Sequence, residues 1–216
     1  MYFFFMYKNL SRLVVNQLIL SNVCLGGYIS GVNVRLKPFI LGAKSSYHIL
    51  DVSYTHIQLK LLINILVSIV SLRQKVLIVK DLDFYNLLTD LNCKNIFFYN
   101  VKWIGGILTN FRIVRRSQKF LEADSFLNDI KVMRYMPSLI FLFDTQISKW
   151  ALFEAFNLDI PVAAILNSDS KYFEFVNYPV IGNNKSFEAL YLYVTVIKNA
   201  ILKGQQKERL KILRIL

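Results

Sequence analysis

Runs of apolar residues alternate with helical patterns along most of the 216-residue chain. Five runs are short, continuous and rich in apolar and β-branched residues, which is typical of strands buried on both faces of a sheet. They cover residues 76–79, 96–99, 139–144, 161–166 and 179–181. These runs predict a mainly parallel sheet.

Apolar residues at helical spacing predict helices before, between and after these strands. The predicted helices cover residues 9–22, 53–69, 82–91, 150–157 and 187–202. We expect the first to end near Gly26-Gly27 and Ser53 to cap the second. Because strands and helices alternate, the predicted fold is an α/β domain with helices on both faces of the sheet and right-handed crossover connections.

Two shorter extended runs, at residues 39–42 and 48–52, flank a turn at residues 44–46. Turn residues between two extended runs predict a hairpin. The longest apolar stretch, residues 61–72, contains Asn64 and Ser68 and is shorter than the roughly 20 residues of a membrane span. We therefore expect it to be part of a buried core helix.

Residues 112–135 differ from the rest of the chain, because they carry charges of both signs and lack a long β-branched run. This pattern predicts a helical segment that protrudes from the sheet, and Met136-Pro137 ends it. The predicted globular α/β domain accordingly comprises residues 1–111 and 136–216, with residues 112–135 as an inserted helical hairpin.

A pair of glycines, Gly105 and Gly106, follows the strand predicted at residues 96–99. Glycine adopts backbone angles closed to other residues and lets a partner approach the backbone closely. Thr109 or Asn110 is placed to cap a helix that follows. We interpret these four residues as a structural turn that leads from the sheet into the insertion.

The chain carries 26 Lys and Arg against 14 Asp and Glu, a net charge of +12. A surplus of this size favours a polyanionic partner, either nucleic acid or an anionic membrane surface. Basic residues cluster around the first hairpin and around the glycine pair, where a tryptophan is available to stack on bases, and together they favour binding to a phosphate backbone. The predicted nucleic-acid-binding residues are Arg35, Lys37, Lys44, Lys102, Trp103, Arg112, Arg115, Arg116 and Lys119.

Residues suited to catalysis are few. His48 and His56 are the only histidines, and neither has a cysteine or carboxylate at ligand spacing, so we expect structural roles for both. Asp81, Asp83 and Asp144 follow predicted strands, where a carboxylate either caps a helix or faces a ligand. The chain has no glycine-rich phosphate-binding motif. We predict no catalytic residue, no metal and no cofactor.

Composition suggests the genetic origin of the chain. Its 23 Ile, and its 17 Lys against 9 Arg, have codons rich in A and T, which leads to the hypothesis of a mitochondrial gene. The N-terminal residues lack the basic start of a secretory signal and the Arg-rich character of an import presequence. Cys24 and Cys93 show no pairing or zinc-ligand spacing, and we expect both to be small buried side chains.

Several blocks of the chain resemble the bacterial-type small-subunit ribosomal protein S2 family, in order and spacing, from about residue 10 to residue 200. The most specific block is residues 103–111, which contains the glycine pair followed by Thr109-Asn110. The other blocks are residues 37–44, 48–51 with Thr55, 136–137, 160–162 and 179–184.

The resemblance implies a non-enzymatic structural constituent of the small ribosomal subunit, with a flavodoxin-like α/β domain and a protruding helical hairpin. It also implies contacts with small-subunit rRNA, through the predicted nucleic-acid-binding residues, and with neighbouring ribosomal proteins. We expect no membrane partner and no small-molecule substrate. Combined with the composition, the expected location is the mitochondrial matrix, in the mitochondrial ribosome.

The chain departs from the family pattern in three places. Only 24 residues separate Phe111 from Met136, so the implied hairpin is shortened. Cys24 and Gly27 stand where the family usually carries histidines, so no metal role is carried over. Residues 166–170 and the pair at 183–184 also differ from the family's usual segments.

Two alternatives from other classes remain open. One is a Rossmann-like nucleotide-binding enzyme that uses Asp81 or Asp144. The other is a peripheral membrane protein that uses the basic C-terminal helix, since basic residues there alternate with apolar ones. These apolar residues are Ile201, Leu202, Leu210, Leu213 and Leu216.

Overall fold

A computed structural model describes residues 15–79, 93, 95–99, 102–116, 130 and 132–213. The helix predicted for residues 82–91, the carboxylates Asp81 and Asp83, and the middle of the predicted insertion lie outside these residues.

The five predicted strands form one parallel sheet. In order across the sheet they are β5 (Ile96–Tyr99), β4 (Val76–Val79), β6 (Leu139–Leu142), β7 (Val162–Leu166) and β8 (Tyr178–Ile181). Every neighbouring pair is parallel. Counted along the chain, the first of these strands, β4, lies between the second, β5, and the third, β6. This is the strand order of flavodoxin-like folds, and the predicted α/β class is confirmed.

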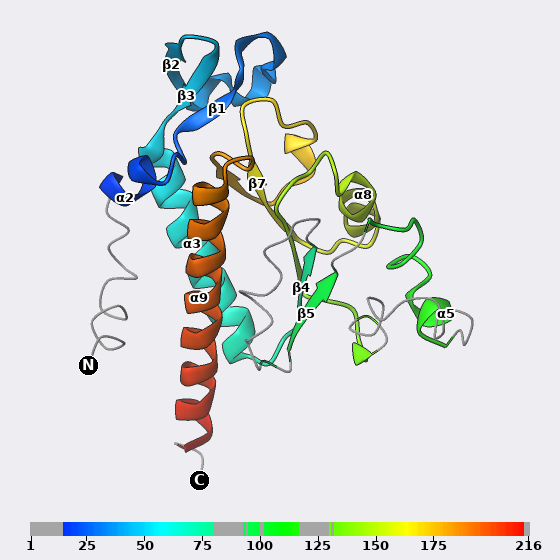
Figure 1. The fold of residues 1–216 in the computed structure, drawn as a ribbon. Coiled ribbons are helices and arrows are strands. Elements are labelled where there is room, and N and C mark those ends of the chain that lie inside the picture. Colours follow the sequence, from blue (N-terminus) through cyan, green and yellow to red (C-terminus); the bar gives the residue numbers. More distant parts are fainter. Residues whose placement is uncertain are drawn as a thin grey trace.

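Helices cover both faces of this sheet (Figure 1). One face carries α3 (Val52–Ser71) and α9 (Phe187–Leu213), which lie side by side. A Cβ atom on Gly204 of α9 would lie 2.7 Å from the Cβ atom of Val70 of α3, so only glycine permits this approach. The other face carries α8 (Lys149–Asn157) and α5 (Phe111–Arg116).

Alternating side chains of the central strand β4 enter two separate cores. Val76 and Ile78 pack with α3 and α9, whereas Leu77 and Val79 pack with α8 and α5. All four side chains are buried. This burial on both faces explains why a continuous apolar run marked the strand in the sequence.

A second, antiparallel sheet has the strand order β1 (Leu25–Tyr28), β3 (Tyr47–Leu50), β2 (Ile40–Lys44). The predicted hairpin is confirmed as β2 and β3. Strand β1 was not predicted, because Gly26-Gly27 was interpreted as the end of a helix. In the structure these glycines lie within β1, at an irregularity between the paired residues Leu25 and Tyr28, and a Cβ atom on Gly26 would lie 2.9 Å from the Cβ atom of His48.

Two helix boundaries also differ from their predictions. Within the described residues the first helix, α2 (Val15–Leu20), ends six residues before the glycine pair. Helix α3 is capped by Asp51, whose carboxylate accepts a hydrogen bond from the backbone N–H of Ser53 at 2.9 Å. Ser53 is therefore not the cap, because it lies inside the first turn.

Within the described part of the chain, α3 is the one helix that is long and apolar enough to cross a membrane. Its buried residues, among them Leu59, Leu66 and Val70, pack against the sheet and α9. The helix is thus part of the core along its inner face, as predicted for residues 61–72.

Candidate nucleic-acid interface

The glycine pair lies in a turn at residues 105–110, between β5 and α5. Gly106 has a φ angle of +93°, which disfavours any residue with a side chain. A Cβ atom on Gly105, by contrast, would meet no atom within 4 Å. The turn therefore requires glycine at position 106, while Gly105 leaves the backbone open on its outer side.

One buried carboxylate holds this turn in place. Glu154 of α8 accepts hydrogen bonds from the indole N–H of Trp103 at 2.9 Å and from the backbone N–H of Gly106 at 2.7 Å. Its second oxygen accepts from the backbone N–H groups of Leu108 at 2.7 Å and Thr109 at 3.1 Å. Because four donors point at one carboxylate, the path of the chain from the sheet into α5 is fixed by hydrogen bonds to a charged group.

Sequence reasoning missed Glu154. The signal that would have found it is local: a single acidic residue in an otherwise apolar helical segment, Trp150 to Phe156. A buried carboxylate in such a segment needs several donors, and a turn rich in unpaired backbone N–H groups supplies them.

Trp103 does not occupy the position predicted for it. The side chain is only 6% exposed, its N–H bonds to Glu154, and its ring centroid lies 4.8 Å from that of Tyr99. A ring enclosed in this way offers no face to an RNA base, so the predicted stacking role is wrong. The tryptophan instead anchors the start of the turn.

Three of the predicted basic residues around the turn, Lys102, Arg112 and Arg116, are exposed. Phe111 and Val114 of α5 are buried, whereas Arg112 and Arg116 of the same helix are exposed. The backbone of Asn110 accepts hydrogen bonds from the N–H groups of Ile113 and Val114, which places Asn110 at the start of α5. Exposed cations are thereby carried by a helix whose other side is packed in the core. Lys102 is also exposed, Arg115 lies within α5, and Lys119 lies outside the described residues.

The second predicted cluster lies on the small sheet and on the 3-10 turn η2 (Val34–Phe39) before it. Lys37 and Lys44 are exposed, whereas Arg35 forms an ion pair with Glu174 at 3.1 Å. Figure 1 places this sheet well away from α5, so the structure separates the predicted residues into two surfaces.

An exposed pair of tyrosines accompanies this second cluster. Tyr28, Tyr47 and Lys44 lie on neighbouring positions of β1, β3 and β2. The two rings are 4.6 Å apart between centroids, and the Tyr47 hydroxyl donates a hydrogen bond to the Tyr28 hydroxyl at 2.9 Å. Neighbours across strands share one face of a sheet, so this face presents aromatic rings beside a cation.

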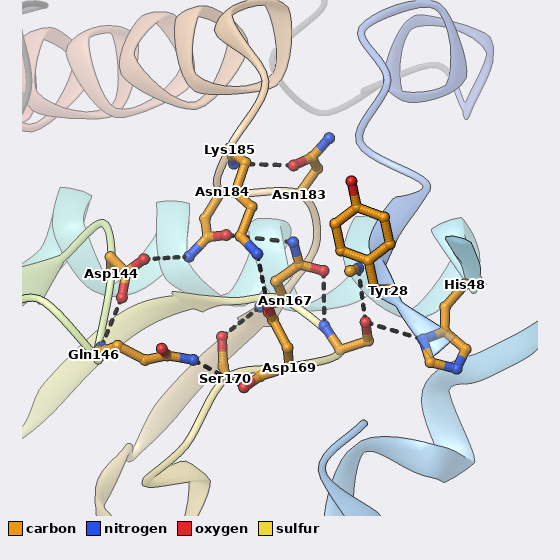
Figure 2. A network of polar contacts seen from close by, with 12 residues as sticks. Tyr28, His48, Asp144, Gln146, Asn167, Asp169, Ser170, Asn183, Asn184 and Lys185 are labelled. Carbon is orange, nitrogen blue, oxygen red and sulfur yellow. Dashed lines mark hydrogen bonds and ion pairs between the residues drawn. The ribbon is translucent and has the colours of Figure 1, made fainter. Parts of the chain in front are cut away.

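The carboxyl ends of β6, β7 and β8 meet in a polar network (Figure 2). Asp144 accepts hydrogen bonds from the backbone N–H of Gln146 at 2.6 Å and from the side-chain amide of Asn184 at 3.0 Å. Asp169 forms an ion pair with Lys185 at 2.5 Å. These carboxylates bind groups of their own chain. Asp144 is not the predicted helix cap, because the N-cap position of α8 is Ser148; Asp144 instead holds the turn that precedes this helix.

The two histidines lie near this end of the fold. His48 is buried, with Nδ1 3.3 Å from the Ser168 hydroxyl, which also accepts a hydrogen bond from the backbone N–H of Gly27 at 2.7 Å. Burial, together with the nearby charge of Lys60, lowers the pKa of His56. Among the residues that the structure describes, no three His, Cys, Asp or Glu side chains lie together in a way that could hold a metal.

The family model described as ribosomal protein S2 matches residues 18–126 and 115–204. The small ribosomal subunit protein uS2 of Baumannia cicadellinicola is 30% identical over 212 residues, covering 83% of this chain and 90% of that protein. The uS2 protein of Buchnera aphidicola is 29% identical over 227 residues, covering 91% and 93%. That of Acidiphilium cryptum is 28% identical over 223 residues, covering 90% and 87%.

These matches span both sheets, the glycine turn and α8, and they exclude the Rossmann-like enzyme considered from the sequence. The chain therefore belongs to the ribosomal protein S2 family and is a structural, non-enzymatic component of the small ribosomal subunit.

Proposed function

We propose that this protein is a component of the mitochondrial small ribosomal subunit that binds small-subunit rRNA and neighbouring ribosomal proteins. The relatives named above are bacterial, so the mitochondrial part of the proposal rests on composition. The excess of Ile and Lys supports an AT-rich genome.

The anchored turn is the observation that carries the RNA-binding part of the proposal. Glu154 fixes the turn, the buried face of α5 fixes the helix, and Arg112 and Arg116 consequently face solvent at defined positions. The planar guanidinium of an arginine binds phosphate oxygens through two parallel hydrogen bonds, and the fixed helix presents two such groups to solvent. Lys102, Arg115 and Lys119 extend the same basic segment.

The small sheet provides a second proposed RNA contact. Lys37 and Lys44 supply charge, and Tyr28 and Tyr47 supply the aromatic rings that the sequence had assigned to Trp103. Stacking of bases on aromatic rings beside cations is a common mode of binding to unpaired RNA.

Contacts with neighbouring proteins are proposed for the outer face of α3. Tyr54, Ile57 and Leu61 are between 48% and 62% exposed and follow one another at helical spacing. An apolar stripe of this kind on a packed helix is typical of a surface that another protein covers.

Sucrose-gradient sedimentation of a mitochondrial lysate tests the proposal, with this chain followed by mass spectrometry. We expect the chain to sediment with the small subunit and to return to the top of the gradient after RNase treatment. A chain that stays at the top without RNase would contradict ribosomal assembly. A chain absent from purified mitochondria but present on ribosomes elsewhere would contradict the mitochondrial assignment alone.

A further inference from the structure

We propose that the C-terminal end of α9, residues 203–213, is an additional RNA-binding element of this chain. The proposal rests on the proposed binding of rRNA and adds a surface to it. The match to the family model ends at residue 204, so nearly all of this element lies outside the matched residues. Its role must therefore be argued from its own residues.

The end of α9 projects from the body of the protein. The helix has 27 residues, which corresponds to a length of roughly 40 Å. The buried residues of α9 end with Ile201 and Gly204, and residues 209–213 are all exposed. Figure 1 shows this end of the helix extending past the other described elements.

The projecting end is held at its base by an ion pair. The guanidinium of Arg73, just after α3, lies 2.7 Å from the carboxylate of Glu208. Together with the close packing of Gly204 against Val70, this contact fixes the direction in which the helix leaves the body. The element is therefore presented to a partner as a formed helix.

The charge of this element is almost entirely positive. Lys203, Lys207, Arg209 and Lys211 are exposed, and the one carboxylate among residues 203–213 is Glu208, which is paired with Arg73. The three lysines follow at four-residue steps, so neighbouring lysines on one side of the helix are about 6 Å apart. Cations repeated along one side of a helix suit a phosphate backbone, which carries a regular series of negative charges.

The apolar residues of the same element argue against a membrane. Leu210 and Leu213 lie on the side away from the body, but Ile212 lies on a different side, at 100° per residue. A helix that lies in a membrane interface needs a continuous, wide apolar face. Two leucines do not form such a face, so RNA is the partner that the charges favour.

Titration of the full chain with a transcript of the small-subunit rRNA, at several salt concentrations, tests this inference. The test variant replaces Lys207, Arg209 and Lys211 by Gln. The slope of log K against log salt is negative, and each lost phosphate contact reduces its magnitude by about 0.7 to 0.9, so we expect the magnitude to fall by roughly two to three. At low salt the affinity should fall at least about tenfold. The matched control, Lys207→Arg with Arg209→Lys and Lys211→Arg, keeps every charge and should bind as the wild type does.

A second variant, Leu210→Gln with Leu213→Gln, distinguishes RNA from other partners. We expect it to bind the transcript as the wild type does, and we expect the wild type not to float with vesicles of phosphatidylcholine and phosphatidylserine. Flotation that requires the two leucines would overturn the inference in favour of a membrane. If the wild type binds the transcript and the variant with Gln at positions 207, 209 and 211 binds it equally well, the inference alone is overturned. If the wild type does not bind, the proposed function is contradicted as well.

Discussion

At the scale of single residues, Glu154 determines more of the candidate interface than any basic side chain. It is 7% exposed and accepts four hydrogen bonds from a turn about 50 residues earlier in the chain. A contact between segments so far apart leaves no periodic signal in the sequence. The same contact explains why Trp103 was assigned to the surface and is found in the core.

Glu154→Gln should destabilise the protein. The amide nitrogen that replaces one carboxylate oxygen cannot accept, so two of the four N–H donors lose their acceptor inside the protein. We expect a loss of about 2 to 4 kcal/mol in the free energy of unfolding, measured by urea denaturation. Glu188→Gln, at an exposed site in the first turn of α9, is the control and should change stability by less than about 1 kcal/mol. Equal stability of Glu154→Gln and the wild type would show that the carboxylate does not anchor the turn.

At the scale of elements, the sequence predicted best the strands that have apolar surroundings on both faces. All five strands of the parallel sheet were predicted, because burial on both faces demands a continuous apolar run. Strand β1 was missed because its glycines are selected by contacts with His48 and Asp169, not by strand propensity. The cap of α3 was assigned two residues late, because Asp51 and Ser53 are both good capping residues.

The orientation of α5 could not be predicted from its charges, and it leads to a prediction about RNA binding. Replacing Arg112, Arg115 and Arg116 by Gln should weaken binding of the small-subunit rRNA transcript. It should also reduce the magnitude of the slope of log K against log salt by roughly two to three. Ile113→Gln is the matched control, because Ile113 is 70% exposed on the same helix and carries no charge. If the Ile113 variant lost as much affinity as the arginine variant, apolar contacts and not charge would account for binding by α5.

At the scale of the whole molecule, the positive and negative groups behind the net charge of +12 are unevenly distributed. Most described carboxylates bind their own chain: Asp51 caps α3, Glu154 holds the turn, and Asp144 joins the polar network. Three more form ion pairs, with Arg35, Arg73 and Lys185. The negative charge is thereby held within the fold, while α5 and the end of α9 present cations to solvent.

These two basic helices lie on separate parts of the molecule, so their contributions to binding should be independent (Figure 1). A variant that combines the Gln substitutions of α5 with those of α9 should lose a free energy of binding equal to the sum of the two separate losses, within about 0.5 kcal/mol. The magnitude of its slope of log K against log salt should likewise fall by the sum of the two decreases, because each set of cations releases its own counterions. The same rRNA titration measures both quantities. A combined variant that binds no worse than the weaker-binding single variant would mean that the two helices bind RNA only as one unit, because losing either set of charges would then already remove the contribution of the other.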